Sequence, residues 1–82
     1  MKKTIYIYIN SYCFDPVIYT SLEEARKALD NDIDYFKERY KYDDDDIREC
    51  YDELNNCSVS EGYIGTYLGD TDFDIYIREI EI

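Results

Sequence analysis

The sequence predicts a small α+β domain in which three to four strands form an antiparallel or mixed sheet and two helices cover one of its faces. Alternating apolar residues near both ends of the chain indicate strands. Between them lie two segments whose apolar residues recur every three or four positions, which indicates helices. The 82 residues are expected to form a single domain, 1–82. The expected order is strand, short strand, helix, helix, strand, strand.

The first predicted strand alternates isoleucine with tyrosine. Ile5, Ile7 and Ile9 share one side, and Tyr6 and Tyr8 share the other. Because both sides are largely apolar, the strand is predicted to lie in the centre of the sheet, with the isoleucines in the core and the tyrosines outside.

A loop is expected over residues 10–15, followed by a short second strand. Pro16 restricts the preceding residue to an extended conformation, and residues 17–20 have a strand pattern. Cys13, beside Phe14 in this loop, is expected to be a small core residue.

The first helix is predicted to begin after Ser21, which forms a capping box with Glu24. Its core-facing stripe comprises Leu22, Ala25, Leu29, Ile33, Phe36 and Tyr40. The opposite side places Asp30, Asp34 and Glu38 one turn apart, where each pair of like charges costs roughly 0.2 to 0.5 kcal/mol.

A second helix is predicted to begin at the four consecutive aspartates 43–46, because carboxylates stabilise the positive end of a helix. Its apolar face comprises Ile47, Cys50, Tyr51 and Leu54. Asn55 and Asn56 are expected to end it.

The C-terminal segment is predicted to be a hairpin, with strands over 63–68 and 73–82 and a turn over 69–71. Its apolar residues change parity, so a bulge is expected near Arg78–Glu79. The final strand is apolar over Ile75–Ile82, and its edge could pair with a second copy to form a homodimer.

The chain carries a net charge of -11, and seven carboxylates fall within the eleven residues 43–53. Solubility of a small domain requires a net charge of only about 2 to 8 units, and excess charge destabilises a compact state. The excess therefore predicts a basic partner. Direct binding to DNA or RNA is not expected, because nine basic residues oppose twenty acids and phosphate repulsion would dominate.

Several other functions are disfavoured by the residue inventory. The chain has no histidine, so the usual serine and cysteine dyads are excluded, and we expect neither an enzyme nor a cofactor. Residues 30–34 and 70–74 resemble the opening of a calcium loop. That loop also needs a glycine at its sixth position and a glutamate at its twelfth, and neither segment has both, so no metal site is expected. Three cysteines without a C-x-x-C spacing favour a reducing, cytoplasmic location. No membrane contact is expected.

The acidic side chains on the two predicted helices form candidate rows that imitate phosphates. Residues three and four apart on a helix lie about 5 to 6 Å from each other, comparable with successive phosphates. Tyr35 and Tyr42 are candidate aromatic anchors, whereas Tyr51 is assigned to the core. The predicted partner-binding residues are Asp30, Asp34, Glu38, Asp43, Asp44, Asp45, Asp46, Glu49, Asp52, Glu53, Tyr35 and Tyr42.

In these acidic residues and its many tyrosines, the chain resembles the small acidic inhibitors that phages and mobile elements direct against CRISPR and restriction systems. That resemblance is compositional and covers the helical half. It implies an inhibitor that blocks a basic nucleic-acid-binding site of a bacterial defence effector in the host cytoplasm. Two alternatives remain open: an immunity or antitoxin protein that neutralises a basic nuclease, and a structural or regulatory domain without a basic partner.

Overall fold

The computed structural model describes residues 1–12 and 15–82, apart from the side chain at position 60. Cys13, which we expected in the core, lies outside the described residues. The elements are β1 (Lys2–Asn10), β2 (Val17–Tyr19), α1 (Leu22–Tyr40), α2 (Asp44–Asn55), a 3₁₀ turn η1 (Val59–Glu61), β3 (Tyr63–Leu68) and β4 (Thr71–Glu81).

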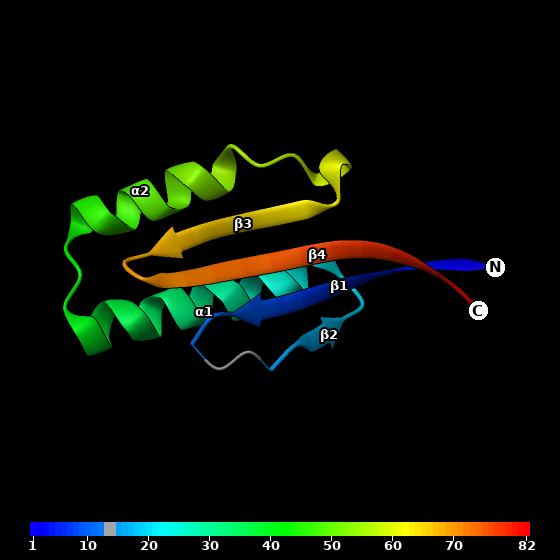
Figure 1. The fold of residues 1–82 in the computed structure, drawn as a ribbon, viewed down its shortest axis with the longest axis horizontal. Coiled ribbons are helices and arrows are strands. Elements are labelled where there is room, and N and C mark those ends of the chain that lie inside the picture. The colour runs from blue at the N-terminus through cyan, green and yellow to red at the C-terminus, as the bar shows by residue number, and fades with distance from the viewer. Residues whose placement is uncertain (13–14) are drawn as a thin grey trace.

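The four strands form one antiparallel sheet in the order β2-β1-β4-β3 (Figure 1). Helix α1 packs across β1 and β2, and α2 packs along β3. Both helices lie on the same face of the sheet, because their buried residues form one cluster with buried side chains from β1, β3 and β4. The predicted α+β class, the element order and the central position of β1 are confirmed.

The two sides of β1 are the reverse of the prediction. Tyr8 is only 4% exposed and belongs to the core, while Ile5 and Ile7 lie on the sheet face without helices, called the open face below. The register explains this, because Tyr8 pairs with the buried Ile75 of β4. A tyrosine can be buried when its hydroxyl has a partner, and here it donates to Asp32 of α1 at 2.6 Å.

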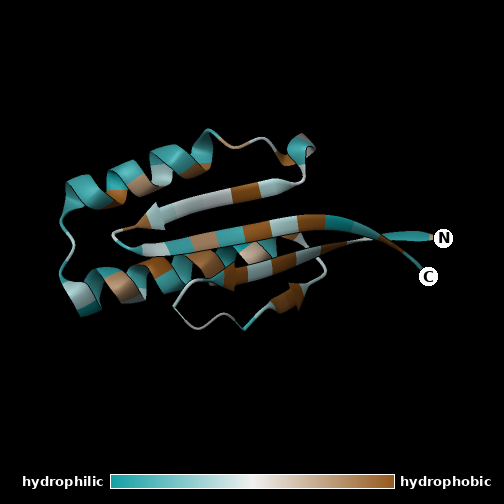
Figure 2. Cartoon of the chain, in the orientation of Figure 1, coloured by the Kyte–Doolittle hydropathy of each residue, from teal (hydrophilic) through white to brown (hydrophobic). Residues whose placement is uncertain are grey.

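Helix α1 follows its predicted stripe closely. The Ser21 hydroxyl accepts a hydrogen bond from the Glu24 amide at 3.2 Å, and the helix ends where Lys41 takes a left-handed conformation with φ of 60°. The middle of the stripe is buried at Ala25, Leu29, Ile33 and Phe36. Figure 2 shows the resulting separation of hydrophobic and hydrophilic residues along both helices. Tyr40, at the end of the stripe, is 47% exposed and stacks on Phe36.

The C-terminal hairpin is confirmed, but the expected bulge is wrong. Gly69 and Asp70 form the turn, and the φ of 61° at Gly69 is the conformation that glycine supplies at the first position of a tight hairpin turn. The register of β1 with β4 is unbroken from Lys2–Glu81 to Asn10–Phe73. Ile80 therefore lies on the open face.

Beyond β2 and β3, the strands β1 and β4 continue as a two-stranded ribbon (Figure 1). The core cluster reaches Tyr6 and Ile77 but includes no residue farther along the ribbon, so the apolar residues near the ribbon's end need not point to either face. The ribbon joins the two ends of the chain, since the Ile82 amide donates to the Met1 carbonyl at 2.8 Å.

The expected free edge along Ile75–Ile82 is absent from the first part of this segment. β4 lies between β1 and β3, and the Ile77 amide donates to the Gly62 carbonyl at 2.9 Å. The hairpin places β3 on the side where a second copy was expected, so edge pairing through Ile75 and Ile77 is excluded. A homodimer by another route stays a prediction.

The assignment of the two sheet faces predicts the effect of paired isoleucine substitutions. Ile75 is fully buried, so Ile75→Ala is expected to lower the free energy of unfolding by about 2 to 5 kcal/mol. Ile7 is only partly buried on the open face, so Ile7→Ala is expected to cost about 1 kcal/mol. Urea unfolding measures both, and an equal or larger loss for Ile7→Ala would show that the faces are reversed.

Candidate protein-interaction surface

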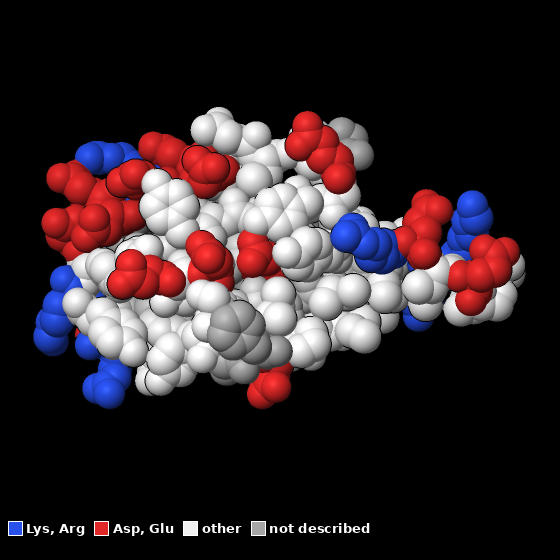
Figure 3. Space-filling model, in the orientation of Figure 1, with Lys and Arg blue, Asp and Glu red and all other residues white. Residues whose placement is uncertain are grey.

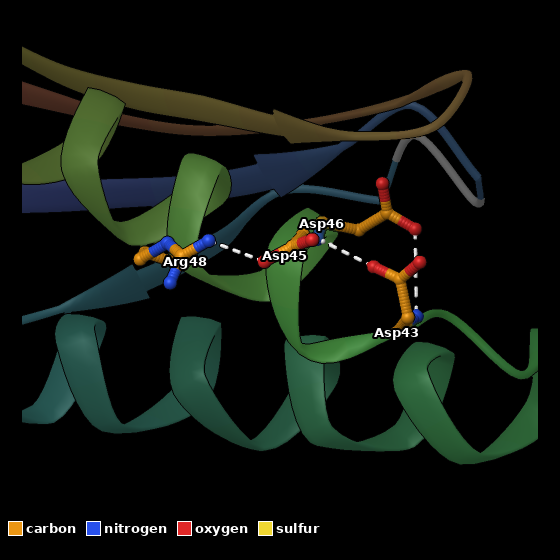
Figure 4. A network of polar contacts seen from close by, with 4 residues as sticks. All are labelled: Asp43, Asp45, Asp46 and Arg48. Atoms are coloured by element: carbon orange, nitrogen blue, oxygen red, sulfur yellow. Dashed lines mark hydrogen bonds and ion pairs between the residues drawn. The ribbon is translucent and has the colours of Figure 1, made fainter.

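The aspartate run has a structural function at the start of α2. The carboxylate of Asp43 accepts the Asp46 amide at 2.9 Å, and the Asp46 carboxylate accepts the Asp43 amide at 3.4 Å (Figure 4). This reciprocal capping box satisfies two amide donors at the helix end. Asp44 and Asp45 lie in the first turn, where the helix dipole favours negative charge. Folding alone therefore accounts for part of the run.

Two of these aspartates also have basic partners within the chain. Asp45 pairs with Arg48 one turn along α2 (Figure 4). Asp44 pairs with Lys37 of α1 at 3.4 Å and so links the two helices. Both aspartate side chains are at least 80% exposed, so each pair contributes little to stability and can exchange for an external cation.

The acids in the second half of α2 have no comparable structural role. Asp52 and Glu53 lie in the last turn, where the dipole is negative, and that turn has no basic residue. Helix α1 follows the usual rule, with two acids in its first turn and Lys37 and Arg39 in its last. The charge at the end of α2 is therefore electrostatically unfavourable for folding, and the Asp52 and Glu53 side chains are exposed.

The acids of α1 point in different directions. The Asp30 carboxylate accepts the Tyr51 hydroxyl of α2 at 3.1 Å and is half-buried. Asp32 turns toward the sheet, where it accepts hydrogen bonds from Tyr8 and from the Asn10 amide group. Asp34 and Glu38 are exposed. Among the predicted partner-binding acids, those of α2 together with Asp34 and Glu38 are therefore accessible to a partner, whereas Asp30 is not fully so.

The two predicted aromatic anchors differ in exposure. Tyr35 is 56% exposed and meets Phe36 edge-on. Tyr42 is half-buried over the β3–β4 turn, where its hydroxyl oxygen lies 2.0 Å from the position that a Cβ of residue 69 would occupy. Gly69 is therefore required for this packing, and the Tyr42 ring helps to hold the turn.

The structure extends the acidic surface beyond the predicted residues. The Tyr67 hydroxyl of β3 donates to the Glu49 carboxylate at 2.8 Å, which joins α2 to the edge of the sheet. On the open face beside it, Asp72 and Asp74 of β4 line a hollow of about 380 Å³ together with Glu53. We call Glu49, Asp52, Glu53, Asp72 and Asp74 the acidic band. Figure 3 shows acidic side chains over α2 and a short row of them across the middle of the sheet face, with basic side chains farther along the ribbon.

Sequence reasoning missed the β4 part of this band. In residues 71–77, carboxylates alternate with the apolar residues that become core, so the pattern already places Asp72 and Asp74 on one exposed side. The D-x-D-x-D spacing of residues 70–74 had instead directed the prediction toward a calcium loop. In the described part of the chain, no group of three or more potential ligands lies close enough to hold a metal ion.

The two described cysteines, Cys50 and Cys57, both pack within the fold. Cys50 is fully buried, as expected for a core residue, and burial raises the pKa of its thiol. Cys57 is half-buried, and its sulfur lies 3.3 Å from the Gly65 carbonyl oxygen and 3.4 Å from the Gly65 amide nitrogen. Cys57 thereby ties the end of α2 to β3.

No family model, curated protein or solved structure matches the chain. Within the described residues, neither helix has the length and apolar character needed to cross a membrane. The function is therefore argued from the surface itself.

The capping role of Asp43 predicts a loss of stability when its carboxylate is removed. Asp43→Ala is expected to lower the free energy of unfolding by about 1 kcal/mol, because the Asp46 amide loses its acceptor. Asp43→Asn, which keeps an acceptor oxygen, should preserve most of that stability. Thermal unfolding of the two variants separates the capping bond from the charge, and equal stability of the two would contradict the assignment.

Three tyrosine–carboxylate bonds predict a loss of stability at high pH. The pKa values of Tyr51 and Tyr63 are raised above the usual 10.0, first by burial and then by Asp30 and Asp74, and Glu49 raises the pKa of Tyr67 through its hydrogen bond. The unfolded chain releases these protons first. The stabilisation is therefore complete below pH 10 and is lost as the pH rises through the folded-state values.

Urea unfolding across this range should show the loss. Tyr51→Phe is expected to reduce the steepness of the decline, while Tyr35→Phe, which changes an exposed ring, should leave it unchanged. A wild-type stability that stays constant above pH 10 would contradict the prediction.

Proposed function

We propose that this protein is a non-enzymatic inhibitor that presents its acidic surface to the basic nucleic-acid-binding site of a bacterial defence effector, in the manner of anti-CRISPR proteins. The observation that carries the proposal is the end of α2, where Asp52 and Glu53 are exposed against the helix dipole without a basic neighbour in the turn. Charge that opposes folding is expected where binding requires it.

The arrangement of the acids supports a nucleic-acid-like surface. Glu49 lies one turn from both Asp45 and Glu53, so carboxylates repeat along α2 at about 5 to 6 Å. The acidic band continues from the helix around β3 onto the open face. A basic groove that normally holds phosphates would meet a comparable run of negative charge, and long-range attraction would speed the encounter.

The partner is expected to be a protein that itself binds DNA or RNA. Affinity capture with this protein from bacterial extracts that contain CRISPR effectors and nucleases should retain such a partner at low salt. High salt and the partner's own nucleic acid should each displace it, because both compete for the same basic groove. Retention that is indifferent to both would contradict mimicry. A basic nuclease encoded beside this protein would instead identify an immunity protein.

Charge-neutral variants provide the direct test once the partner is recovered. Asp34→Asn with Asp52→Asn removes two exposed carboxylates from the helices without removing the described capping or inter-helix bonds. We expect binding to weaken at least about tenfold, which corresponds to roughly 1.4 kcal/mol. We also expect stability to be unchanged or slightly raised, because like-charge repulsion falls.

The matched control is Glu23→Gln with Glu24→Gln. It makes the same change in net charge, but in the first turn of α1, where acids favour the helix. This control should retain the affinity for the partner. Equal weakening by the two double variants would show that only net charge matters, and no weakening by the first would refute the proposed surface.

A further inference from the structure

The hollow on the open face combines aromatic walls with acidic groups. It lies over β3 and β4, and its lining includes Tyr63, Tyr67 and Tyr76 together with Asp72 and Asp74. The register places Tyr67 opposite Asp72 and Tyr63 opposite Tyr76. A second, smaller hollow on the β1 side shares Asp72, Asp74 and Tyr76. These three side chains therefore border two adjacent depressions.

Gly65 shapes the larger hollow. Glycine weakens the interior of a strand and often marks a close approach of another group. Here a Cβ at Gly65 would lie 2.1 Å from the Tyr63 hydroxyl oxygen and 2.9 Å from Asp74 Oδ1. The missing side chain lets the Tyr63 ring lie across β3, where its hydroxyl donates to the Asp74 carboxylate. The position of Asp74 is thus fixed before any partner arrives.

The acids of the hollow are not neutralised by the protein itself. Among the described residues, the ion pairs involve only Glu79, Glu81, Asp44 and Asp45, so Glu53, Asp72 and Asp74 have no basic partner. One cation of the chain comes near the rim: the Arg78 guanidinium lies 5.4 Å from the centre of the Tyr76 ring. A guanidinium of the chain thus already makes a cation–π contact with one ring of the group.

We propose that this hollow binds an arginine side chain of the partner protein. A guanidinium is planar, stacks on tyrosine rings and donates two parallel hydrogen bonds to a carboxylate, whereas a lysine ammonium is a more strongly hydrated point charge. Tyrosine rings around a pair of carboxylates therefore match a guanidinium better than an ammonium group. The volume of about 380 Å³ is within the range of small-ligand sites.

The surroundings favour an arginine on a polypeptide over a free cation. Ile9 lines the smaller hollow, and Ile7 and Ile18 lie opposite each other on the same open face. Apolar residues on either side of an arginine in a polypeptide could cover these isoleucines while the guanidinium enters the hollow. The identity of the partner rests on the proposed function, because a groove that binds nucleic acid contains arginines that hold phosphates. Binding of an arginine side chain by the hollow can be tested without that partner.

The test compares tri-arginine with tri-lysine, two peptides of equal charge, by amide chemical-shift changes in the ¹⁵N-labelled protein. We expect tri-arginine to bind about threefold more tightly, with the largest shifts at Gly65, Asp72 and Asp74. Asp72→Asn with Asp74→Asn should abolish the preference while keeping an oxygen acceptor for the Tyr63 hydroxyl. Tyr76→Leu should reduce tri-arginine to the affinity of tri-lysine, because the carboxylates remain and a stacking ring is lost.

Glu23→Gln with Glu24→Gln, in the first turn of α1 and outside both hollows, serves as the control and should keep the preference for arginine. Equal binding of the two peptides to the wild type would overturn the inference, as would a preference that survives in Asp72→Asn with Asp74→Asn. Unfolding curves confirm that each variant is folded. Because Asp34→Asn with Asp52→Asn tests the proposed function and the strand variants test the hollow, the two can fail separately.

Discussion

The alternation of apolar and acidic side chains along β4 is the constraint on which the rest of the structure depends. The two-residue turn at Gly69–Asp70 fixes the pairing of β3 with β4, and β4 in turn fixes β1. A shift of one residue would exchange the two faces completely. With the observed register, Phe73 and Ile75 form the centre of the core, and Asp72 and Asp74, which alternate with them, lie on the open face. The core and the acidic hollow are thus two sides of one strand.

The position of each acid along its helix distinguishes the structural carboxylates from those available for binding. At the start of α2, Asp43 and Asp46 complete a capping box, so a dense run of acids there is compatible with stability. At the end of the same helix, Asp52 has neither a favourable dipole nor a basic neighbour in its turn. The density of charge drew attention to the first group, whereas the physical argument for a partner is stronger for the second.

The sequence predicted the elements well and the sheet faces only in part. Periodicity and caps were sufficient for α1, α2 and the hairpin, because these signals are local. The sides of β1 depended on its register with β4 and on Asp32 as an acceptor for Tyr8, and both involve distant residues. The acids of the helices could be read from the chain. The hollow could not, since it requires Gly65, Tyr63 and Asp74 to meet across two strands.

The ribbon formed by β1 and β4 determines how the protein can be tethered. Both chain ends lie at its tip, at the opposite end of the molecule from the α1–α2 connection (Figure 1). The molecule measures 45 Å along its longest axis. A fused domain or a surface linker at either terminus would therefore leave from the tip and orient the start of α2 outward, so immobilised protein would keep its most acidic end accessible.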